Sequence, residues 1–276
     1  MNKKHLMSGI VIVLLLFITP SITAQTYREI KGWSKEINER IETFLNTTLT
    51  MNIRKVAVFD GDGTVVGQAP HYLADEALYR YADKFYKGKS DKFSKEKMAI
   101  LNRMVKDGNN VGKAYVEDRA HFLAGMTPEE VANLGYDCYV ESYQGKFYPE
   151  MKQLIANLKE YGFEIWILTA SPEFLYQKFL SEELGIPEVN ILGMKSVVVD
   201  GVLTNEIVLP IPQDDGKANV IPTFIKTRPL VVGGNSRGDM DMLNQSCGLK
   251  IVVNPDDTTV RGAEDGPMHG LTVKGY

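Results

Sequence analysis

The sequence predicts an α/β protein that has a doubly wound parallel sheet and an all-helical segment inserted into it. Two observations lead to this prediction. Five short apolar runs of strand length are separated by stretches with helical spacing, which is typical of strands and helices that alternate in one parallel sheet. The long stretch between the first two runs has helical spacing throughout and no strand candidate, so we interpret it as an insertion.

The predicted strands are short, apolar and rich in β-branched side chains, which favour strands. In chain order they are Val56–Phe59, Phe163–Leu168, Asn190–Met194, Leu230–Gly233 and Leu249–Val253. Helices are predicted between them at 150–161, from Ser171 and Pro172 to about residue 184, at 217–225 and at 239–244, after a helical lead-in at 25–50. The pair Asp200-Gly201 predicts the turn of a hairpin that spans residues 197–204.

The predicted helical insertion covers residues 68–146. Mixed apolar and charged spacing marks three helical runs, His71–Lys87, Ser94–Val105 and Val111–Leu123. A fourth begins at Thr127-Pro128-Glu129-Glu130, where a capping Thr, a proline in the first helical position and a Glu three residues after the Thr form a strong helix start. We therefore divide the chain into residues 1–24, a core of residues 25–67 and 147–276, and the insertion.

Residues 1–24 resemble a signal peptide. Lys3 and Lys4 form a positive start, Ile10–Ile18 is an unbroken apolar run, Pro20 ends it, and small residues precede Gln25. The alternative is a membrane anchor, but the run is well short of the roughly 20 apolar residues that a spanning helix needs. We expect an exported protein without stable membrane insertion after cleavage, periplasmic if the host is Gram-negative and otherwise secreted.

The composition excludes some classes of partner. The net charge is -4 and no basic run is present, so nucleic acid is not an expected ligand. A phosphate ligand would need a metal ion or a few local cations to offset repulsion. The two cysteines, Cys138 and Cys247, lie in segments assigned to different parts of the fold, and both are interpreted as buried small hydrophobes rather than as a disulfide. The oligomeric state stays open.

The first predicted strand ends in two acids, Asp60 and Asp62. Residues two apart project to the same side of an extended chain, so both carboxylates reach the carboxyl end of the sheet, where ligands of such folds bind. Two ionised carboxylates repel each other unless a cation lies between them or one takes a proton. A hard cation such as Mg²⁺ meets this need, and Gly61 and Gly63 allow a tight turn around it.

Four more polar residues fall at predicted strand or helix ends. Thr169 ends the second strand and offers a hydroxyl to a phosphate oxygen. Lys217 begins a helix and can neutralise both a phosphate and a nucleophile. Asn235 and Asp239 follow the fourth strand, and their oxygens can complete a metal shell with Asp60 and Asp62.

This ordered series resembles the four motifs of the haloacid dehalogenase superfamily of phosphatases. The motifs are Asp60-Gly61-Asp62-Gly63-Thr64, Thr169, Lys217, and Asn235 with Asp239, and the resemblance covers residues 55 to about 255. Each motif alone is weak, but four in order are specific. The resemblance implies a modified Rossmann core, a helical cap between the first and second motifs, and a phosphorylated aspartate as intermediate. The phosphoserine and phosphorylcholine phosphatases, which have a small helical cap, are the most similar in pattern.

The sequence departs from the family pattern at two places. Asn235 stands where Asp is commoner, which removes one negative charge from the metal shell. Residues 66–70 lack the acid that phosphoserine enzymes carry at the cap hinge, which argues against phosphoserine as substrate. A choline group would need an aromatic box, and the heptad tyrosines Tyr72, Tyr79 and Tyr86 are more often core packing than such a box.

The expected reaction is Mg²⁺-dependent hydrolysis of a small phosphorylated metabolite. Asp60 attacks phosphorus, Asp62 protonates the leaving oxygen and later activates water, and Thr169 and Lys217 stabilise charge on the phosphoryl oxygens. We expect further substrate contacts from a set of polar or aromatic residues near the strand end and in the cap. These are Ala170, Gln68, His71, Tyr72 and Arg119.

Rival interpretations rest on other patterns. Gly234-Asn235-Ser236-Arg237-Gly238 has the form of a serine nucleophile elbow, with Asp257 and His269 following, and predicts a serine esterase. The forty or so residues after Ser236 are too few for such a fold, and this interpretation leaves Asp60 and Lys217 unexplained. Glycines near Asp62 also suggest a dinucleotide loop, and the stretch begins like a calcium loop but has Val65 where Gly is required. Asn235 favours a third class, a silent phosphate-ester binding protein.

Overall fold

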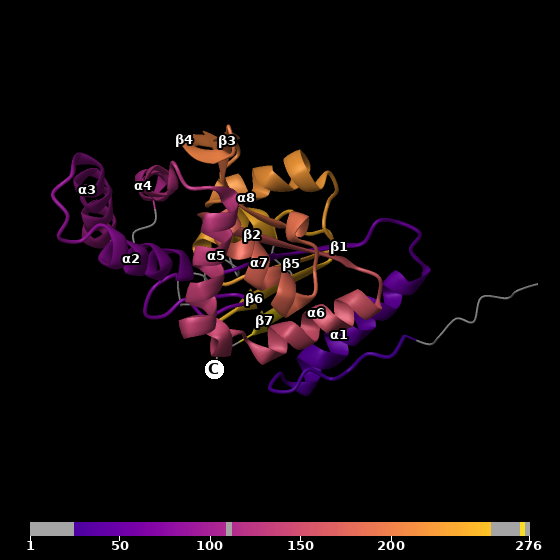
Figure 1. Ribbon diagram of the computed structural model, residues 1–276. Helices are drawn as coiled ribbons and strands as arrows, with labels where there is room; N and C mark the ends of the chain where they lie inside the picture. The colour runs from indigo at the N-terminus through magenta and orange to yellow at the C-terminus, as the bar shows by residue number, and fades with distance from the viewer. Residues whose placement is uncertain (1–24, 109–111, 255–270, 274–276) are drawn as a thin grey trace, which may run out of the picture.

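The computed structural model describes residues 25–108, 112–254 and 271–273. A single mixed sheet lies at its centre, with helices packed around it (Figure 1). The predicted signal peptide, Asp257 and His269 lie outside the described residues. Within the described residues, no helix is both long enough and apolar enough to cross a bilayer.

The sheet has the strand order β4-β3-β2-β1-β5-β6-β7. All neighbouring pairs are parallel except β3 with β4, which is antiparallel. The strands are β1 Val56–Asp60, β2 Glu164–Pro172, β3 Ile191–Val199, β4 Val202–Val208, β5 Val231–Gly234, β6 Leu249–Val253 and β7 Leu271–Val273. The predicted fold class, a mainly parallel sheet between helices, is confirmed.

Alternating residues of β1 face two different hydrophobic clusters. Ala57 and Phe59 belong to a large cluster with helices α1 Lys35–Thr47, α6 Pro149–Glu160 and α7 Glu173–Leu184. Val56 and Val58 belong to a second cluster with α8 Asp215–Val220, the following helical turn Ile221–Ile225 and α9 Met240–Leu243. Both faces of the strand are therefore covered by helices, which explains why its sequence is an uninterrupted apolar run.

The register of the central strands brings three strand ends to one edge. Asp60 lies beside Leu168 of β2, and Phe59 lies beside Gly233 of β5. The residues that follow these strand ends therefore meet at one place. From β1 the chain first adds strands on the β2 side and later on the β5 side, so this edge is the switch point at which open α/β sheets bind ligands.

Some predicted boundaries were wrong. β2 continues to Pro172, so α7 begins at Glu173 and Ser171 still belongs to the strand. β3 joins the predicted third strand to the first arm of the hairpin, which turns at Asp200-Gly201 as predicted. The short β7 was not predicted, because three residues are too few for a periodic signal.

The insertion between β1 and β2 is helical throughout its described part. Its helices are α2 Leu73–Phe85, α3 Lys92–Asp107, α4 Lys113–Leu123 and α5 Pro128–Cys138. The capping box predicted at Thr127 is present, with both of its hydrogen bonds. In Figure 1, α2, α3 and α4 extend to one side of the sheet. The division of the chain at residues 68 and 146 stays a prediction.

The segments that enter and leave the insertion lie side by side. The Gly67 amide donates to the Lys146 carbonyl at 2.8 Å, and the Tyr148 amide donates to the Val65 carbonyl at 3.0 Å. Farther along, the hairpin of β3 and β4 contacts the far end of the insertion: the Gly125 amide donates to the Leu203 carbonyl, and the Leu203 amide donates to the Met126 carbonyl, both at 2.8 Å. These backbone hydrogen bonds join the insertion both to the end of β1 and to the β3–β4 hairpin.

Helix α5 of the insertion packs directly on α7 of the sheet layer. The two backbones approach so closely that a Cβ atom on Gly135 would lie 2.0 Å from the carbonyl oxygen of Leu175. A side chain at this position cannot be accommodated by rotamer changes, because the opposing atoms belong to the backbone. Gly135 therefore sets the distance between the two helices.

We expect Gly135→Ala to destabilise the protein, although Gly to Ala in a helix ordinarily stabilises it by about 1 kcal/mol. The clash with Leu175 should outweigh that gain and give a net loss of roughly 1–3 kcal/mol in the free energy of unfolding by urea. Gly145→Ala is the matched control, since its added Cβ meets nothing within 4 Å. An unchanged or increased stability of Gly135→Ala would contradict this account of the contact.

Candidate active site

Asp60 ends β1 and Asp62 lies in the turn that follows, and the two residues are 5% and 8% exposed. The Gly61 carbonyl accepts hydrogen bonds from the amides of Val65 and Val66, so the chain folds back tightly on itself. Gly63 has a φ of +82°, and a Cβ there would lie 2.2 Å from Nδ2 of Asn235. The backbone conformation and the close approach of Asn235 both require glycine at this position.

Lys217, in the first turn of α8, links two of the predicted site residues. Its ammonium donates to Oδ1 of Asp60 at 2.6 Å and to Oδ1 of Asp239 at 2.5 Å. All three side chains are almost fully buried. The second oxygen of Asp239 accepts from the amides of Asn235 and Ser236, which fixes the loop after β5.

Burial and the shared contact with Lys217 determine the pKa values of Asp60 and Asp239. Burial raises the pKa of Asp60 to about 7, and the Asp239 charge acts in the same direction, while Lys217 opposes both. Although burial acts to raise it, the charge of Lys217 lowers the pKa of Asp239. Lys217 loses solvation, but the two carboxylates raise its pKa and keep it protonated. The lysine therefore carries a fixed positive charge beside Asp60.

Three hydroxyl groups donate to Asp62. The Tyr176 hydroxyl donates to its Oδ1 at 2.8 Å, and the hydroxyls of Thr169 and Ser171 donate to its Oδ2 at 3.2 and 3.3 Å. Burial raises the pKa of Asp62, although the hydroxyl donors and Arg119 oppose the shift. A buried carboxyl with a raised pKa is suited to donate a proton.

Oxygens of Asp60 and Asn235 both lie close to the hydroxyl of Thr64. The Thr64 hydroxyl lies 3.1 Å from Oδ2 of Asp60 and 3.4 Å from Oδ1 of Asn235, within hydrogen-bonding distance of both. A carboxylate and an amide oxygen are hard ligands that fit Mg²⁺, which usually takes one or two protein carboxylates and keeps several waters. Within the described ranges, no group of three or more His, Cys, Asp or Glu side chains could hold a metal ion.

The other two predicted metal ligands are placed differently. Both oxygens of Asp239 are engaged by Lys217 and by the loop amides, and the Asp62 carboxylate accepts from three hydroxyls. The residues present therefore fit a magnesium ion held by Asp60 and Asn235, with Asp239 fixing the loop that carries Asn235.

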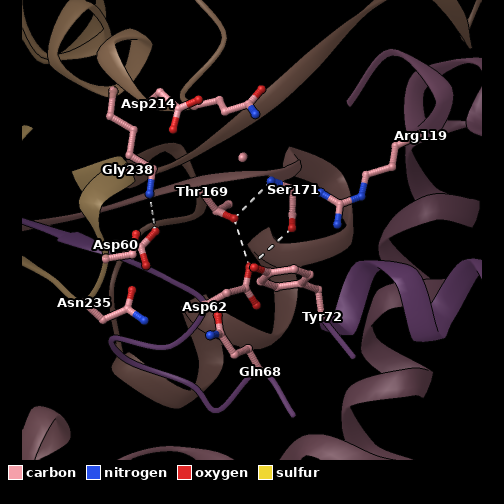
Figure 2. A pocket seen from close by; sticks show the side chains of 14 residues that line it. Asp60, Asp62, Gln68, Tyr72, Arg119, Thr169, Ser171, Asp214, Asn235 and Gly238 are labelled. Atoms are coloured by element: carbon pink, nitrogen blue, oxygen red, sulfur yellow. Dashed lines mark hydrogen bonds and ion pairs between the residues drawn. The ribbon is translucent and has the colours of Figure 1, made fainter. Parts of the chain in front are cut away.

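A pocket of about 240 Å³ opens over these residues (Figure 2). In this view Asp60 and Asn235 lie on the left, Asp62 and Thr169 near the centre, and Arg119 on the right. The lining comprises Asp60, Asp62, Gln68, Tyr72, Arg119, Thr169, Ala170, Ser171, Gln213, Asp214, Lys217, Asn235, Ser236 and Gly238. The strand ends and the helical insertion both contribute to the walls.

Arg119 is a charged group from the insertion that reaches this pocket. It is 1% exposed, and its Nε and Nη2 lie 2.9 and 2.8 Å from Oδ1 of Asp75. The guanidinium also lies over the rings of Tyr72 and Tyr115, 5.7 and 4.9 Å from their centroids. The planar group is thus held rigidly at the pocket wall.

The structure does not bring every predicted residue to the pocket. His71 is exposed, its ring contacts Tyr79, and it is not among the lining residues. His71 lies just before the start of α2, and the direction in which its side chain points depends on tertiary packing that the sequence does not reveal. Of the heptad tyrosines, Tyr72 lines the pocket, whereas Tyr86 packs among aromatic rings of the insertion. Cys138 is buried as predicted, but Cys247 is exposed, and both are free thiols.

Several residues in the pocket or in contact with its carboxyl groups were not predicted from the sequence. Ser171 was interpreted as a helix start, but β2 runs past it and leaves its hydroxyl facing Asp62. Gln213 and Asp214 lie in the loop before α8, where no regular pattern marks them. Tyr176 lies on α7 and is fully buried, and its sequence context is indistinguishable from that of an ordinary core aromatic.

The serine esterase interpretation finds no support in the described residues. The Ser236 hydroxyl donates to Oδ2 of Asp239 at 3.1 Å, in a capping box at the start of the short helical segment Arg237–Asp239. Ser236 thus serves as a helix cap, and its proposed partners Asp257 and His269 lie outside the described residues.

Comparison with known families and curated proteins gives a consistent result. A family model described as haloacid dehalogenase-like hydrolase matches residues 57–244. The chain is 24% identical over 216 residues to phosphoserine phosphatase SerB1 of Mycobacterium tuberculosis, covering 75% of this chain and 67% of that one. The same identity relates it to a putative hydrolase of Mycobacterium leprae, with 75% and 68% coverage.

Solved structures share the fold. A Bordetella pertussis protein of unknown function has a TM-score of 0.64 at 16% identity, covering 80% of this chain and 99% of that one. A probable phosphoserine phosphatase from Vibrio cholerae has a TM-score of 0.52 at 15% identity, covering 79% and 60%. At these identities the likeness concerns the arrangement of helices and strands.

Proposed function

This chain belongs to the haloacid dehalogenase-like hydrolases and is a phosphatase of that family. From this premise we propose that it hydrolyses a small phosphomonoester through a phosphorylated Asp60. The observation that carries this proposal is the placement of Asp60 at the pocket floor, paired with Lys217 and close to Asn235. Burial of a carboxylate costs free energy, and a purely structural role gives no reason for that cost. A nucleophile, by contrast, needs a position in the pocket beside a positive charge.

The reaction follows from the two carboxyl groups. Asp60 attacks phosphorus with the ester oxygen as leaving group, and Lys217 stabilises the negative charge shared by the nucleophile and the phosphoryl oxygens. Asp62 donates its proton to the leaving oxygen, then takes a proton from the water that hydrolyses the acyl phosphate. Thr169 lines the same pocket, and its hydroxyl, which donates to Asp62, would turn to the phosphoryl group when the substrate binds.

We propose Mg²⁺ as cofactor, held by Asp60 and Asn235. The ion would supply positive charge to the phosphoryl oxygens and favour the ionised form of Asp60 against the effect of burial. The amide of Asn235 contributes no charge, so we expect the ion to be bound less tightly than by two carboxylates.

We propose that the substrate carries a polar or anionic group beside its phosphate. The pocket is small, and the buried Arg119, whose Nε and Nη2 lie against Asp75, brings a positive charge to its wall. Tyr72 is the only aromatic residue in the described lining, so an aromatic box for a choline group is not formed there. This favours small phosphorylated acids over phosphorylcholine.

A panel of small phosphomonoesters tests these points together. We expect residues 25–276 to release phosphate in the presence of Mg²⁺ and to lose that activity in a chelator, with recovery on adding the metal back. Esters that carry a carboxylate should be preferred over phosphorylcholine. Tight binding without release of phosphate from any ester would instead support a silent binding protein, and activity unaffected by chelation would exclude the metal.

From residues 1–24 we further propose that the enzyme is exported, to the periplasm in a Gram-negative host and otherwise to the medium. Cell fractionation of the full-length chain tests this point, and an uncleaved protein found only in the cytosol would contradict it.

A further inference from the structure

Tyr176 touches the acid of the site without reaching the pocket. It lies on α7, is 0% exposed, and is not among the pocket-lining residues. Its hydroxyl donates to Oδ1 of Asp62 at 2.8 Å, the shortest of the three hydroxyl contacts to that carboxyl. Burial raises the pKa of Tyr176 far above its usual range, so the phenol stays protonated and remains a donor.

The same oxygen is bonded to the helical insertion. The amide of Ala74, the second residue of α2, donates to the Tyr176 hydroxyl at 3.3 Å. Amides in the first turn of a helix lack partners within that helix, so this bond satisfies one of them in a buried place. One oxygen atom thus joins the start of α2 to the carboxyl group of Asp62.

The surroundings hold Tyr176 in place. Leu175, the preceding residue, is the point where the backbone of α7 meets Gly135 of α5, and the Tyr176 ring packs against Phe179. The hydroxyl therefore cannot follow Asp62 if the carboxyl turns. Because the rigid Tyr176 phenol holds Oδ1 of Asp62, the Oδ2 atom stays directed toward Thr169 and Ser171 at the pocket.

We propose that Tyr176 is a positioning residue for Asp62. Through its hydroxyl, the orientation of the Asp62 carboxyl depends on the position of α2. The proposal rests on the function proposed above, in which Asp62 protonates the leaving oxygen. Proton transfer requires the acid to lie within hydrogen-bonding reach of that oxygen, so a loosely held carboxyl would act more slowly on esters that need protonation.

Tyr176→Phe tests the proposal, because it removes only the hydroxyl. We expect kcat/KM for an alkyl phosphate to fall about 10- to 100-fold, and kcat/KM for para-nitrophenyl phosphate to change by less than about 3-fold, since that leaving group needs little protonation and kcat/KM does not include the later hydrolysis of the acyl phosphate, in which Asp62 also acts. Competitive inhibition by inorganic phosphate should change little because Tyr176 does not line the pocket. Hydrogen exchange at the Ala74 amide should become faster, because its acceptor is gone.

Tyr161→Phe is the matched control. Tyr161 is 1% exposed and donates its hydroxyl to Oδ1 of Asn46 at 2.9 Å, outside the site. This variant should keep the activity on both esters and the slow exchange at Ala74. In an Asp62→Asn background, Tyr176→Phe should cause no further loss beyond about 2-fold, since the residue it positions is already disabled.

The outcomes separate two kinds of failure. Equal losses of kcat/KM on both esters, an additive loss in the Asp62→Asn background, or unchanged exchange at Ala74 would overturn the role of Tyr176 while leaving the phosphatase intact. If Asp62→Asn itself retains full activity on both esters, the proposed acid is wrong, and the positioning role is overturned with it.

Discussion

Asp60→Asn is expected to lower kcat for phosphate release by roughly 10⁴-fold or more, the scale seen when a covalent nucleophile is removed. The amide keeps the size of the side chain and can still accept a hydrogen bond from Lys217, but it is a poor nucleophile toward phosphorus. Rapid acid quench of the unmodified protein, followed by mass spectrometry, should show one added phosphoryl group on Asp60, and the variant should show none.

Asp241→Asn is the control for this substitution. Asp241 is exposed on α9, two residues after Asp239 in the same part of the chain, and it does not line the pocket. We expect it to retain activity. A phosphoryl group found on another residue, or substantial metal-dependent turnover by Asp60→Asn, would contradict the assignment of the nucleophile.

Lys217→Met should have the second largest effect, and it should affect stability as well as activity. The variant leaves Asp60 and Asp239 buried without their shared cation, and breaking a buried pair in this way costs about 3–5 kcal/mol. Urea unfolding at pH 8 should show this loss. The unpaired carboxyls have raised pKa values in the folded state only, so their penalty is full above the raised folded pKa and shrinks as the pH falls from there toward the unfolded pKa of about 4.

Lys152→Met provides the comparison. Lys152 pairs with Glu183 at 2.6 Å, the same separation as Lys217 and Asp60, but both side chains are partly exposed. We expect a loss of no more than about 1 kcal/mol, independent of pH between 5 and 8. Equal losses in the two variants would mean that burial does not govern the strength of the Lys217 pairs.

The core of the fold was predictable because buried parallel strands have apolar sequences that end abruptly in polar turns. Val56–Phe59, followed by Asp60 and Asp62, is such a boundary, and the capping box at Thr127 is a local signal of the same clarity. Local chemistry determines these features. The short β7 depends instead on pairing with β6, a non-local contact that leaves no periodic trace in three residues.

The candidate site was predictable to a similar degree. Residues at strand ends, such as Asp60, Thr169 and Asn235, were expected together because parallel strands bring their carboxyl ends to one edge. The pairing of Asp239 with Lys217 depends on where α8 packs. Tyr176 has no polar neighbours in sequence that mark it, and only the tertiary structure places its hydroxyl against Asp62.

The paired segments at Gly67 and Lys146 bear on how such an enzyme changes its substrate range. Because the chain leaves and re-enters the sheet layer at two hydrogen-bonded neighbours, a segment of different length can replace residues 68–146 without moving the strand ends. Asp60, Lys217 and Asn235 all lie outside that segment, so specificity can diversify while the nucleophile and the two residues beside it are inherited unchanged. A replacement segment that packs a helix on α7 in the same way must still place a glycine opposite Leu175, as Gly135 is placed here. This requirement is the main constraint on grafting.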